Sequence, residues 1–204
     1  MTDFEQRYAA ARKAVITRAL ARLNPMQRQG AMTTEGPLLL LAGAGSGKTT
    51  VLIQRVYNLL TYGRGSDSDE VPDWATEEDL AFLEQFPERP SEAEAERAHR
   101  LCAVAVPRPW EIIAITFTNK AAGELKERLA ARLGPAANDV WASTFHSACV
   151  RILRRDIDRI GFDKDFTIYD TDDAKRVVKD ILKEQNLDEK TFPIRSVLSA
   201  ISAS

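Results

Sequence analysis

The sequence has few of the residues that build disulfide frameworks and metal centres. Its 204 residues include two cysteines and two histidines, and Cys102 and Cys149 lie far apart without a Cys-x-x-Cys or Cys/His spacing. This scarcity gives no support to a disulfide framework or a zinc site. We therefore expect both cysteines to be reduced and buried, as free cysteines commonly are.

Long apolar runs are also missing. No segment approaches the roughly 18 consecutive apolar residues of a membrane-spanning helix. The N-terminal segment MTDFEQRYAAARKAV carries charges where a signal peptide would be apolar. The sequence therefore favours a cytoplasmic protein, and its 44% of apolar residues suffices for the packed core of one large domain.

A strong net charge is missing too, but the charge is unevenly distributed. The segment from Arg64 to His99 carries −9 while the whole chain carries −2, which leaves +7 for the remainder. A basic remainder is compatible with binding phosphate backbones. The acidic residues of the segment are Asp67, Asp69, Glu70, Asp73, Glu77, Glu78, Asp79, Glu84, Glu88, Glu92, Glu94 and Glu96, and its arginines are Arg64, Arg89 and Arg97.

Hydrophobic periodicity predicts an alternation of helices and short strands. Apolar runs at 37–42, 112–117 and 140–145 are too short for independent helices and suit strands buried on both faces. Strands that alternate with helices predict an α/β fold, in which helices cover both faces of a parallel sheet. Beyond residue 166 the chain is mainly helical. The predicted helices span 1–22, 26–32, 49–62, 119–133, 146–160, 170–185 and 193–202.

The acidic segment, which we place at residues 65–108, has the composition of an insertion. It opens with glycine, serine and aspartate and closes between Pro107 and Pro109. Scattered apolar residues such as Leu80 and Phe86 could form a helical turn or two. Its one-sided charge nevertheless predicts a solvated and mobile surface excursion. A partner-binding or autoinhibitory role is the alternative.

A glycine-rich turn follows the first predicted strand and precedes a helix. Its sequence AGAGSGKT at 42–49 is a close variant of the phosphate-binding loop, with alanine at position 42 where the strict pattern has glycine. Lys48 can reach the β and γ phosphates of a nucleoside triphosphate, and the Thr49 hydroxyl can ligate Mg²⁺. The loop alone does not distinguish a kinase, GTPase, recombinase or helicase. The residues assigned to phosphate binding are Ala42, Gly43, Ala44, Gly45, Ser46, Gly47, Lys48, Thr49 and Thr50.

Four segments together resemble consecutive motifs of superfamily 1 DNA helicases of the UvrD/Rep/PcrA type. The resemblance implies a RecA-like phosphate-loop motor domain at 23–165, followed by the start of a helical subdomain at 166–204. The helix predicted at 1–22 is an N-terminal extension that the resemblance does not cover. The resemblance also implies ATP and Mg²⁺ as cofactors, and single-stranded DNA and duplex junctions as partners. The segments are LNPMQRQGA at 23–31, LAGAGSGKTTVL at 41–52, AITFTNKAAGELKERL at 114–129 and STFHSACVRILRR at 143–155.

The same resemblance assigns roles to individual residues. Gln27 corresponds to a glutamine that reads adenine, although an isolated glutamine would be interpreted as a surface residue. Two stretches that follow strands correspond to loops that contact single-stranded DNA through phosphates and stacked bases. Taken alone, Thr118 or Asn119 would be a helix N-cap and His146 a structural histidine. The DNA-contact residues are Thr116, Phe117, Thr118, Asn119, Lys120, Thr144, Phe145 and His146.

Part of a hydrolytic site is missing from the sequence. ATP hydrolysis also needs an acidic Mg²⁺ ligand on a strand, a carboxylate that positions water and an arginine that stabilises charge. No DExx motif follows an apolar strand in this chain. We therefore expect the N-terminal part of an ATP-dependent DNA helicase, with Lys48 and Thr49 as its catalytic residues, that is inactive alone. A helicase subunit of a recombination nuclease complex and a non-catalytic nucleotide- or DNA-binding module remain alternatives.

Overall fold

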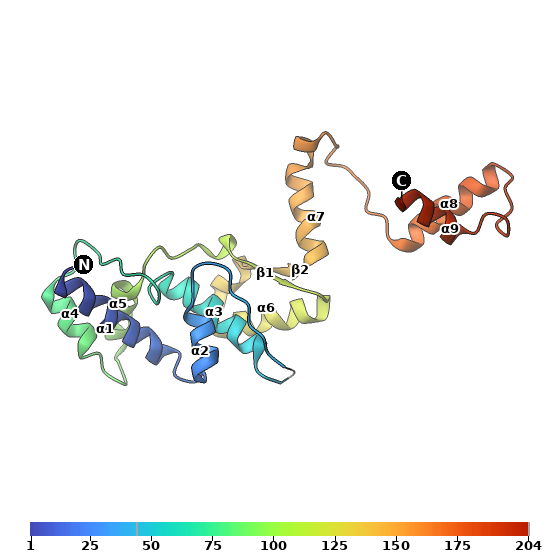
Figure 1. Cartoon of the computed structure of the whole chain (residues 1–204). Coiled ribbons are helices and arrows are strands. Elements are labelled where there is room, and N and C mark those ends of the chain that lie inside the picture. The colour runs from blue at the N-terminus through green and yellow to red at the C-terminus, as the bar shows by residue number, and fades with distance from the viewer. Residues whose placement is uncertain (44, 204) are drawn as a thin grey trace. The chain divides into compact units, whose positions relative to one another are not determined.

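The computed structural model describes residues 1–43 and 45–203, and the chain divides into two compact units, Met1–Ala148 and Cys149–Ser204. The first unit contains α1 (Asp3–Ala19), α2 (Pro25–Met32), α3 (Lys48–Tyr62), α4 (Glu77–Glu84), α5 (Glu92–Cys102), η1 (Pro109–Glu111), β1 (Ile113–Thr116), α6 (Asn119–Leu133), η2 (Gly134–Asp139) and β2 (Trp141–Thr144) (Figure 1). Helix α7 (Phe145–Asp156) begins in the first unit and continues into the second, which also holds η3 (Ile157–Ile160), α8 (Thr171–Glu184) and α9 (Ile194–Ala203). None of the described helices is long and apolar enough to cross a membrane.

Several helices begin where the sequence offers a capping side chain. Asn24 accepts a hydrogen bond from the Gln27 N–H, and the Gln27 side chain accepts one from the Asn24 N–H, with Pro25 at the first helical position. Thr118 likewise caps α6 by accepting from the Ala121 N–H. The predicted short helix at 26–32 is therefore confirmed, and a reciprocal cap fixes where it begins.

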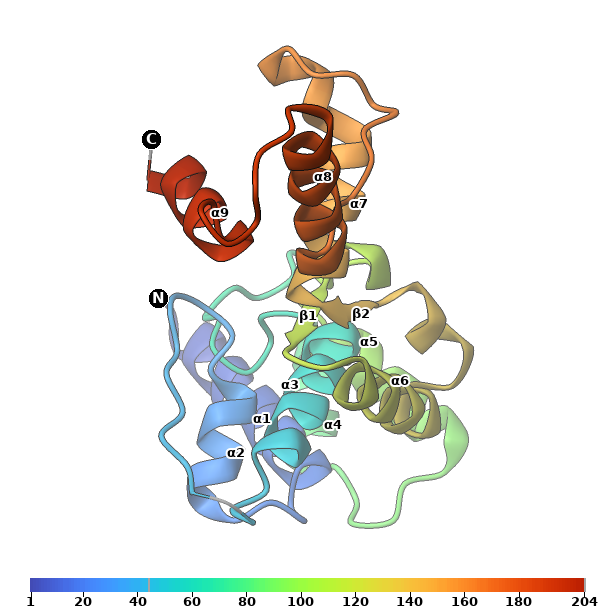
Figure 2. The ribbon, with the colours of Figure 1, turned by 90° about the vertical axis from the view of Figure 1, so that its right-hand side faces the viewer.

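Two parallel strands form the sheet of the first unit. β1 pairs with β2 so that Ile113 lies opposite Trp141 and Thr116 lies opposite Thr144. Helix α6 connects the two strands and packs Leu125 and Leu129 into a core that also includes residues of α3 and both strands. Figure 2 shows α3 and α6 beside this sheet. The helix-rich α/β fold with a parallel sheet is therefore confirmed in its coarse features.

The first predicted strand is wrong for this chain. Residues 37–42 form no strand in the described structure, and the Leu39 and Leu41 side chains are 79% and 89% exposed. The prediction that the strand at 112–117 is buried on both faces is also wrong, because Ile113 and Ile115 of β1 are 48% and 46% exposed. A buried strand needs neighbouring strands for its N–H and C=O groups and cover for its side chains. The apolar run finds neither among the described residues.

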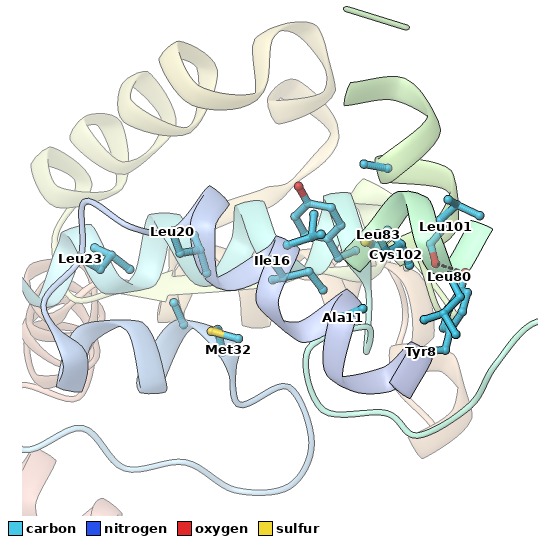
Figure 3. Close-up of a cluster of buried hydrophobic side chains, with 14 residues drawn as sticks. Tyr8, Ala11, Ile16, Leu20, Leu23, Met32, Leu80, Leu83, Leu101 and Cys102 are labelled. Carbon is cyan, nitrogen blue, oxygen red and sulfur yellow. Dashed lines mark hydrogen bonds between the residues drawn. The ribbon is translucent and has the colours of Figure 1, made fainter. Parts of the chain in front are cut away.

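The acidic segment is folded, which contradicts the expectation of a solvated excursion. It forms α4 and α5, and the apolar faces of these helices pack against α1 (Figure 3). Most charged residues lie on the opposite, solvent-facing sides of these helices. A segment with a large excess of acidic residues can therefore still bury an apolar face. The buried members that Figure 3 labels are Tyr8, Ala11, Ile16, Leu20, Leu23, Met32, Leu80, Leu83, Leu101 and Cys102.

Polar side chains of α1 fasten this helix to the acidic segment. Arg12 is fully buried and donates hydrogen bonds to the carbonyl oxygens of Ser68 and Glu70. Burial lowers the pKa of the Arg12 guanidinium, because the charge has left water. The remaining contacts are Arg7 to the Glu84 carboxylate (3.0 and 3.1 Å), the Tyr8 hydroxyl to the Leu101 carbonyl (3.0 Å) and Arg18 to the Phe86 carbonyl (2.5 Å). Residues far apart in the sequence therefore form one packed layer.

Candidate functional site

The glycine-rich turn opens directly into α3. Gly45 and Gly47 have φ angles of 75° and 84°, which is the left-handed region that glycine adopts without a steric cost. Gly47 is the N-cap of α3, and no described side chain caps this end of the helix. The first N–H groups of α3 and its positive dipole end therefore face the turn, as anion binding requires. Ala44, which is also assigned to this loop, lies outside the described residues.

The lysine of the loop lies against the turn. Lys48 Nζ donates to the carbonyl oxygens of Ala42 at 2.9 Å and Gly43 at 2.6 Å. The Ser46 hydroxyl also donates to the Gly43 carbonyl, at 2.7 Å. The turn therefore positions the ammonium group at the N-terminus of α3, where both are available to a single anion.

The glutamine of α2 contacts the same loop. Gln27 Nε2 donates to the Ser46 carbonyl at 3.0 Å, while Gln27 Oε1 accepts from the Asn24 N–H at 3.2 Å. A side chain at position 47 would place its Cβ 2.7 Å from Gln27 Nε2, so glycine permits this close approach. One N–H donor and one acceptor lone pair remain on the Gln27 amide.

A hollow of about 550 Å³ joins these groups. It is bounded by α2, by the turn and by the exposed apolar run that precedes it. The sequence predicted the turn and Gln27 separately, and the structure brings them together. The sequence did not point to the leucines, although their place directly before the turn was a usable signal. The lining residues are Asn24, Met26, Gln27, Leu39, Leu40, Leu41, Ala42, Gly43, Ser46, Lys48 and Val51.

The second group of predicted residues lies at one edge of the sheet. Thr116 and Thr144 are paired in register at the carboxyl ends of β1 and β2, so the residues that follow them leave the sheet side by side. Phe117 is 99% exposed and Phe145 is exposed as well. Neighbouring strands are about 4.8 Å apart. This edge therefore presents two exposed aromatic rings from adjacent strand ends.

The polar residues of this edge differ in exposure and in the hydrogen bonds that their side chains make within the chain. The Thr116 hydroxyl donates to the Thr118 carbonyl at 3.1 Å, and the Thr118 hydroxyl caps α6. Thr144 is buried, and its hydroxyl bonds the Ser147 hydroxyl at 2.8 Å. Asn119 and Lys120 are exposed in the first turn of α6. The lysine and the amide are thus better placed than the threonine hydroxyls to meet a ligand.

His146 is exposed, and its ring lies 6.1 Å from the Phe145 ring in an edge-to-face arrangement. An edge-to-face pair holds both rings at the strand end. The predicted DNA-facing histidine therefore shares the edge with the two aromatic rings.

Acidic side chains do not gather into a metal centre within residues 1–43 and 45–203. Acidic residues at 77–79 and 170–173 take part in local hydrogen bonds instead. Arg97 lowers the pKa of Asp79 by hydrogen bonding to it, and the Asp173 N–H, followed by that of Asp172, lowers the pKa of the N-cap Asp170. Thr49, the predicted Mg²⁺ ligand, is exposed in the first turn of α3.

The two cysteines are free, as expected, but only one is fully buried. Cys102 is buried in the core beside α1, while Cys149 is half-buried. Burial raises the pKa of the Cys102 thiol to about 12. Neither thiol lines the hollow at the glycine-rich turn.

These features define a helix-rich α/β protein with a glycine-rich, lysine-bearing turn at a helix N-terminus. The sequence profile of the UvrD/REP helicase N-terminal domain matches residues 23–70 and 95–204, and the chain belongs to this family. The profile passes over residues 1–22 and 71–94, which contain α1 and α4.

Bacterial helicases are the relatives. The chain is 47% identical over 184 residues to the ATP-dependent DNA helicase PcrA of Bacillus subtilis (strain 168), a match that covers 90% of this chain and 19% of that protein. It is 43% identical over 183 residues to the protein of the same name from Staphylococcus aureus (strain Mu50 / ATCC 700699), again covering 90% and 19%. The chain thus spans about a fifth of the length of these relatives.

Proposed function

We propose that this chain supplies the ATP-binding loop and part of the single-stranded DNA surface of an ATP-dependent DNA helicase. The observation that carries the proposal is that Gln27 and the glycine-rich turn, predicted separately, meet through the 3.0 Å bond to the Ser46 carbonyl and border one hollow. A phosphate site alone accepts many nucleotides. A phosphate site next to a free amide donor and acceptor suits adenine, which presents the N6 donor and N7 acceptor.

The residues of the turn fit a triphosphate with its metal ion. Backbone N–H groups at the α3 N-terminus and the Lys48 ammonium would bind the phosphate oxygens. Thr49 would provide one oxygen ligand to Mg²⁺. When bound, the ion neutralises charge on the β and γ phosphates.

The exposed apolar run belongs to the same proposal. In the RecA-like fold of the whole motor domain, we expect further parts of the protein to cover the leucines of this run and the exposed face of β1. The exposure of Leu39 and Leu41, and of Ile113 and Ile115 on one face of β1, supports this expectation, because such side chains are usually buried.

At the sheet edge, Phe117 and Phe145 would stack on the bases of single-stranded DNA, while Lys120 and Asn119 would bind its phosphates. The parallel register that aligns Thr116 with Thr144 supports one continuous surface. Base–aromatic stacking contributes about 1–3 kcal/mol per base, so Phe117→Ala should weaken oligo(dT) binding by about five- to hundredfold.

Nucleotide titration tests the first half of the proposal. Lys48→Ala removes a charge-assisted contact of roughly 1.5–3 kcal/mol, or about ten- to hundredfold in ATP affinity. Lys126→Ala, which removes an equal charge from the exposed face of α6, is the matched control and should bind ATP normally. Equal ATP affinity of the two variants would contradict the site.

Gln27 is tested separately by comparing ATP with GTP. Gln27→Ala should reduce the discrimination between the two nucleotides while triphosphate binding persists, because the loop N–H groups and Lys48 remain. Calorimetric titration of both nucleotides measures this. Equal ATP and GTP affinity in the unmodified chain would remove the base-reading role.

A further inference from the structure

A basic surface lies outside both sites described so far. One hollow of about 450 Å³ is lined by Arg18, Arg22 and Arg132, and a second of about 310 Å³ is lined by Arg128 and Arg132. The two hollows share Gln54 and Arg132, so they form one continuous surface between α1, α3 and α6. We call this surface the arginine groove.

Two of the guanidinium groups are held in place by aromatic rings. The Arg132 Cζ lies 3.7 Å from the centre of the Tyr57 ring, and the Arg18 Cζ lies 5.3 Å from the centre of the Phe86 ring. Stacking leaves the edge N–H groups of a guanidinium free to donate and fixes the plane in which they donate. The groove therefore holds part of its charge in a fixed orientation before any ligand binds.

The charge of the groove is unbalanced. Neither of the two hollows has an acidic lining residue in the described part of the chain, and Arg22 and Arg128 form no ion pair there. The neighbouring hollow that shares Arg18 includes one carboxylate, Glu88. Four exposed arginines held together without acidic partners repel one another, and an anionic ligand removes that repulsion.

The lining also indicates which kind of anion fits. Single-stranded DNA sites combine positive charge with exposed aromatic rings on which bases stack. No aromatic side chain lines either hollow among the described residues, and the nearby Tyr57 ring is covered by Arg132. A ligand that offers phosphates along its length and keeps its bases inside matches this lining, and duplex DNA has that form.

The groove is separate from the single-strand surface at the sheet edge. Helix α6 begins at Asn119, beside that edge, and Arg132 lies near the other end of the helix. A rise of 1.5 Å per residue separates the two by about 20 Å. The first helix, which supplies Arg18 and lies outside the family profile, therefore adds a charged surface away from the predicted strand path.

We propose that the arginine groove binds the phosphate backbone of double-stranded DNA. The proposal rests on the proposed function, since it adds a duplex contact to a protein that binds single-stranded DNA at Phe117. The contact is with phosphates alone, so its affinity is independent of the DNA sequence and falls steeply with salt concentration.

Fluorescence anisotropy with two DNA probes tests the proposal on the full 204-residue chain. One probe is a blunt, hairpin-closed duplex and the other is oligo(dT). The variant Arg22→Ser/Arg128→Ser removes two exposed charges that have no ion pair in the described structure, so folding should be unaffected. We expect duplex affinity to fall about tenfold and the slope of log affinity against log salt to fall by about 2. Oligo(dT) affinity should stay unchanged.

The matched control is Arg89→Ser/Arg100→Ser, which removes the same charge from exposed positions outside the groove. Equal loss of duplex binding in both double variants would overturn the proposal, because net charge alone would then explain the loss. Poly-glutamate that binds more tightly than the duplex at equal charge concentration would also overturn it, because an acidic protein would then be the preferred ligand. Oligo(dT) binding that Phe117→Ala weakens, without duplex binding, would reject the groove alone. Failure to bind either DNA would reject the proposed function too.

Discussion

At the scale of single residues, replacing Gly65 or Gly123 with alanine should have opposite effects on stability. A Cβ at Gly65 would lie 2.1 Å from the Cys102 carbonyl oxygen, whereas a Cβ at Gly123 would have no atom within 4 Å. Gly65→Ala should therefore destabilise the fold by about 1–3 kcal/mol. Gly123→Ala, in the interior of α6, should stabilise it by about 0.5–1 kcal/mol. Urea unfolding of both variants measures the difference, and equal midpoints would show that the backbone around Gly65 can yield.

A buried thiol and a buried phenol make the stability of the fold vary with pH in the alkaline range. Burial raises the pKa of the Cys102 thiol from 9.0 to about 12 and that of the Tyr8 phenol from 10.0 to about 12. The unfolded chain therefore releases these protons first, so their stabilising effect is complete below about pH 9 and is lost as the pH rises towards about 12. Urea midpoints should fall over this range. Cys102→Ala should flatten the early part of the decline, and an unchanged curve would place the titration elsewhere.

The sequence identified some candidate residues that the structure places together, and their roles remain predictions. Lys48 and Gln27 were identified from the residues around them, and the structure brings them to one hollow. Thr118 and Thr144 were predicted to contact DNA, and their hydroxyls also accept hydrogen bonds from the helix starts that follow. A threonine before a helix offers the same residue type to both uses, so sequence alone cannot rank them.

At the scale of elements, the helices predicted within the family-matched part agree with the observed ranges to within a few residues, because caps and periodicity are local signals. The predictions of a strand at 37–42 and of a mobile acidic segment were wrong for the same reason. The structure of each segment depends on contacts with residues that are distant in the sequence. Glu84 pairs with Arg7 and Leu101 with Tyr8, and no local pattern announces either contact.

The docking of α1 predicts how the acidic segment behaves when this helix is removed. Deleting residues 1–20 would expose the apolar faces of α4 and α5, including Leu80 and Leu101. Limited proteolysis should then cut rapidly within residues 65–108, while the full chain resists. Lys13→Ser, on the exposed face of α1, is the control and should leave the resistance intact. Equal cleavage of the full and shortened chains would mean that α1 does not protect the segment.

At the scale of the whole molecule, the family was predictable from four motifs, and the profile match confirms it. This chain holds only some of the residues that ATP hydrolysis requires. Within the described residues no set of carboxylates surrounds the glycine-rich turn, and the sequence holds no DExx motif after an apolar strand. We therefore predict that this chain can bind a nucleotide without hydrolysing it.

We expect the 204-residue chain to bind ATP without turning it over, even when single-stranded DNA is present. A steady-state phosphate-release assay measures this. DNA-stimulated release that Lys48→Ala abolishes would contradict the prediction, because the water-positioning carboxylate would then have to lie within the chain. Release that persists in the Lys48→Ala variant would point to a contaminating enzyme.

The contact between α1 and the acidic segment also has a consequence for synthesis on the ribosome. Tyr8 is synthesised before Leu101, whose carbonyl accepts its hydroxyl hydrogen bond and which follows 93 positions later. At about 5–20 residues per second, α1 waits for roughly 5–20 s before its buried face can be covered. During that interval its apolar stripe is open to chaperones or to a second nascent chain. The face of α1 that is buried in the folded chain is therefore exposed to solvent during this interval.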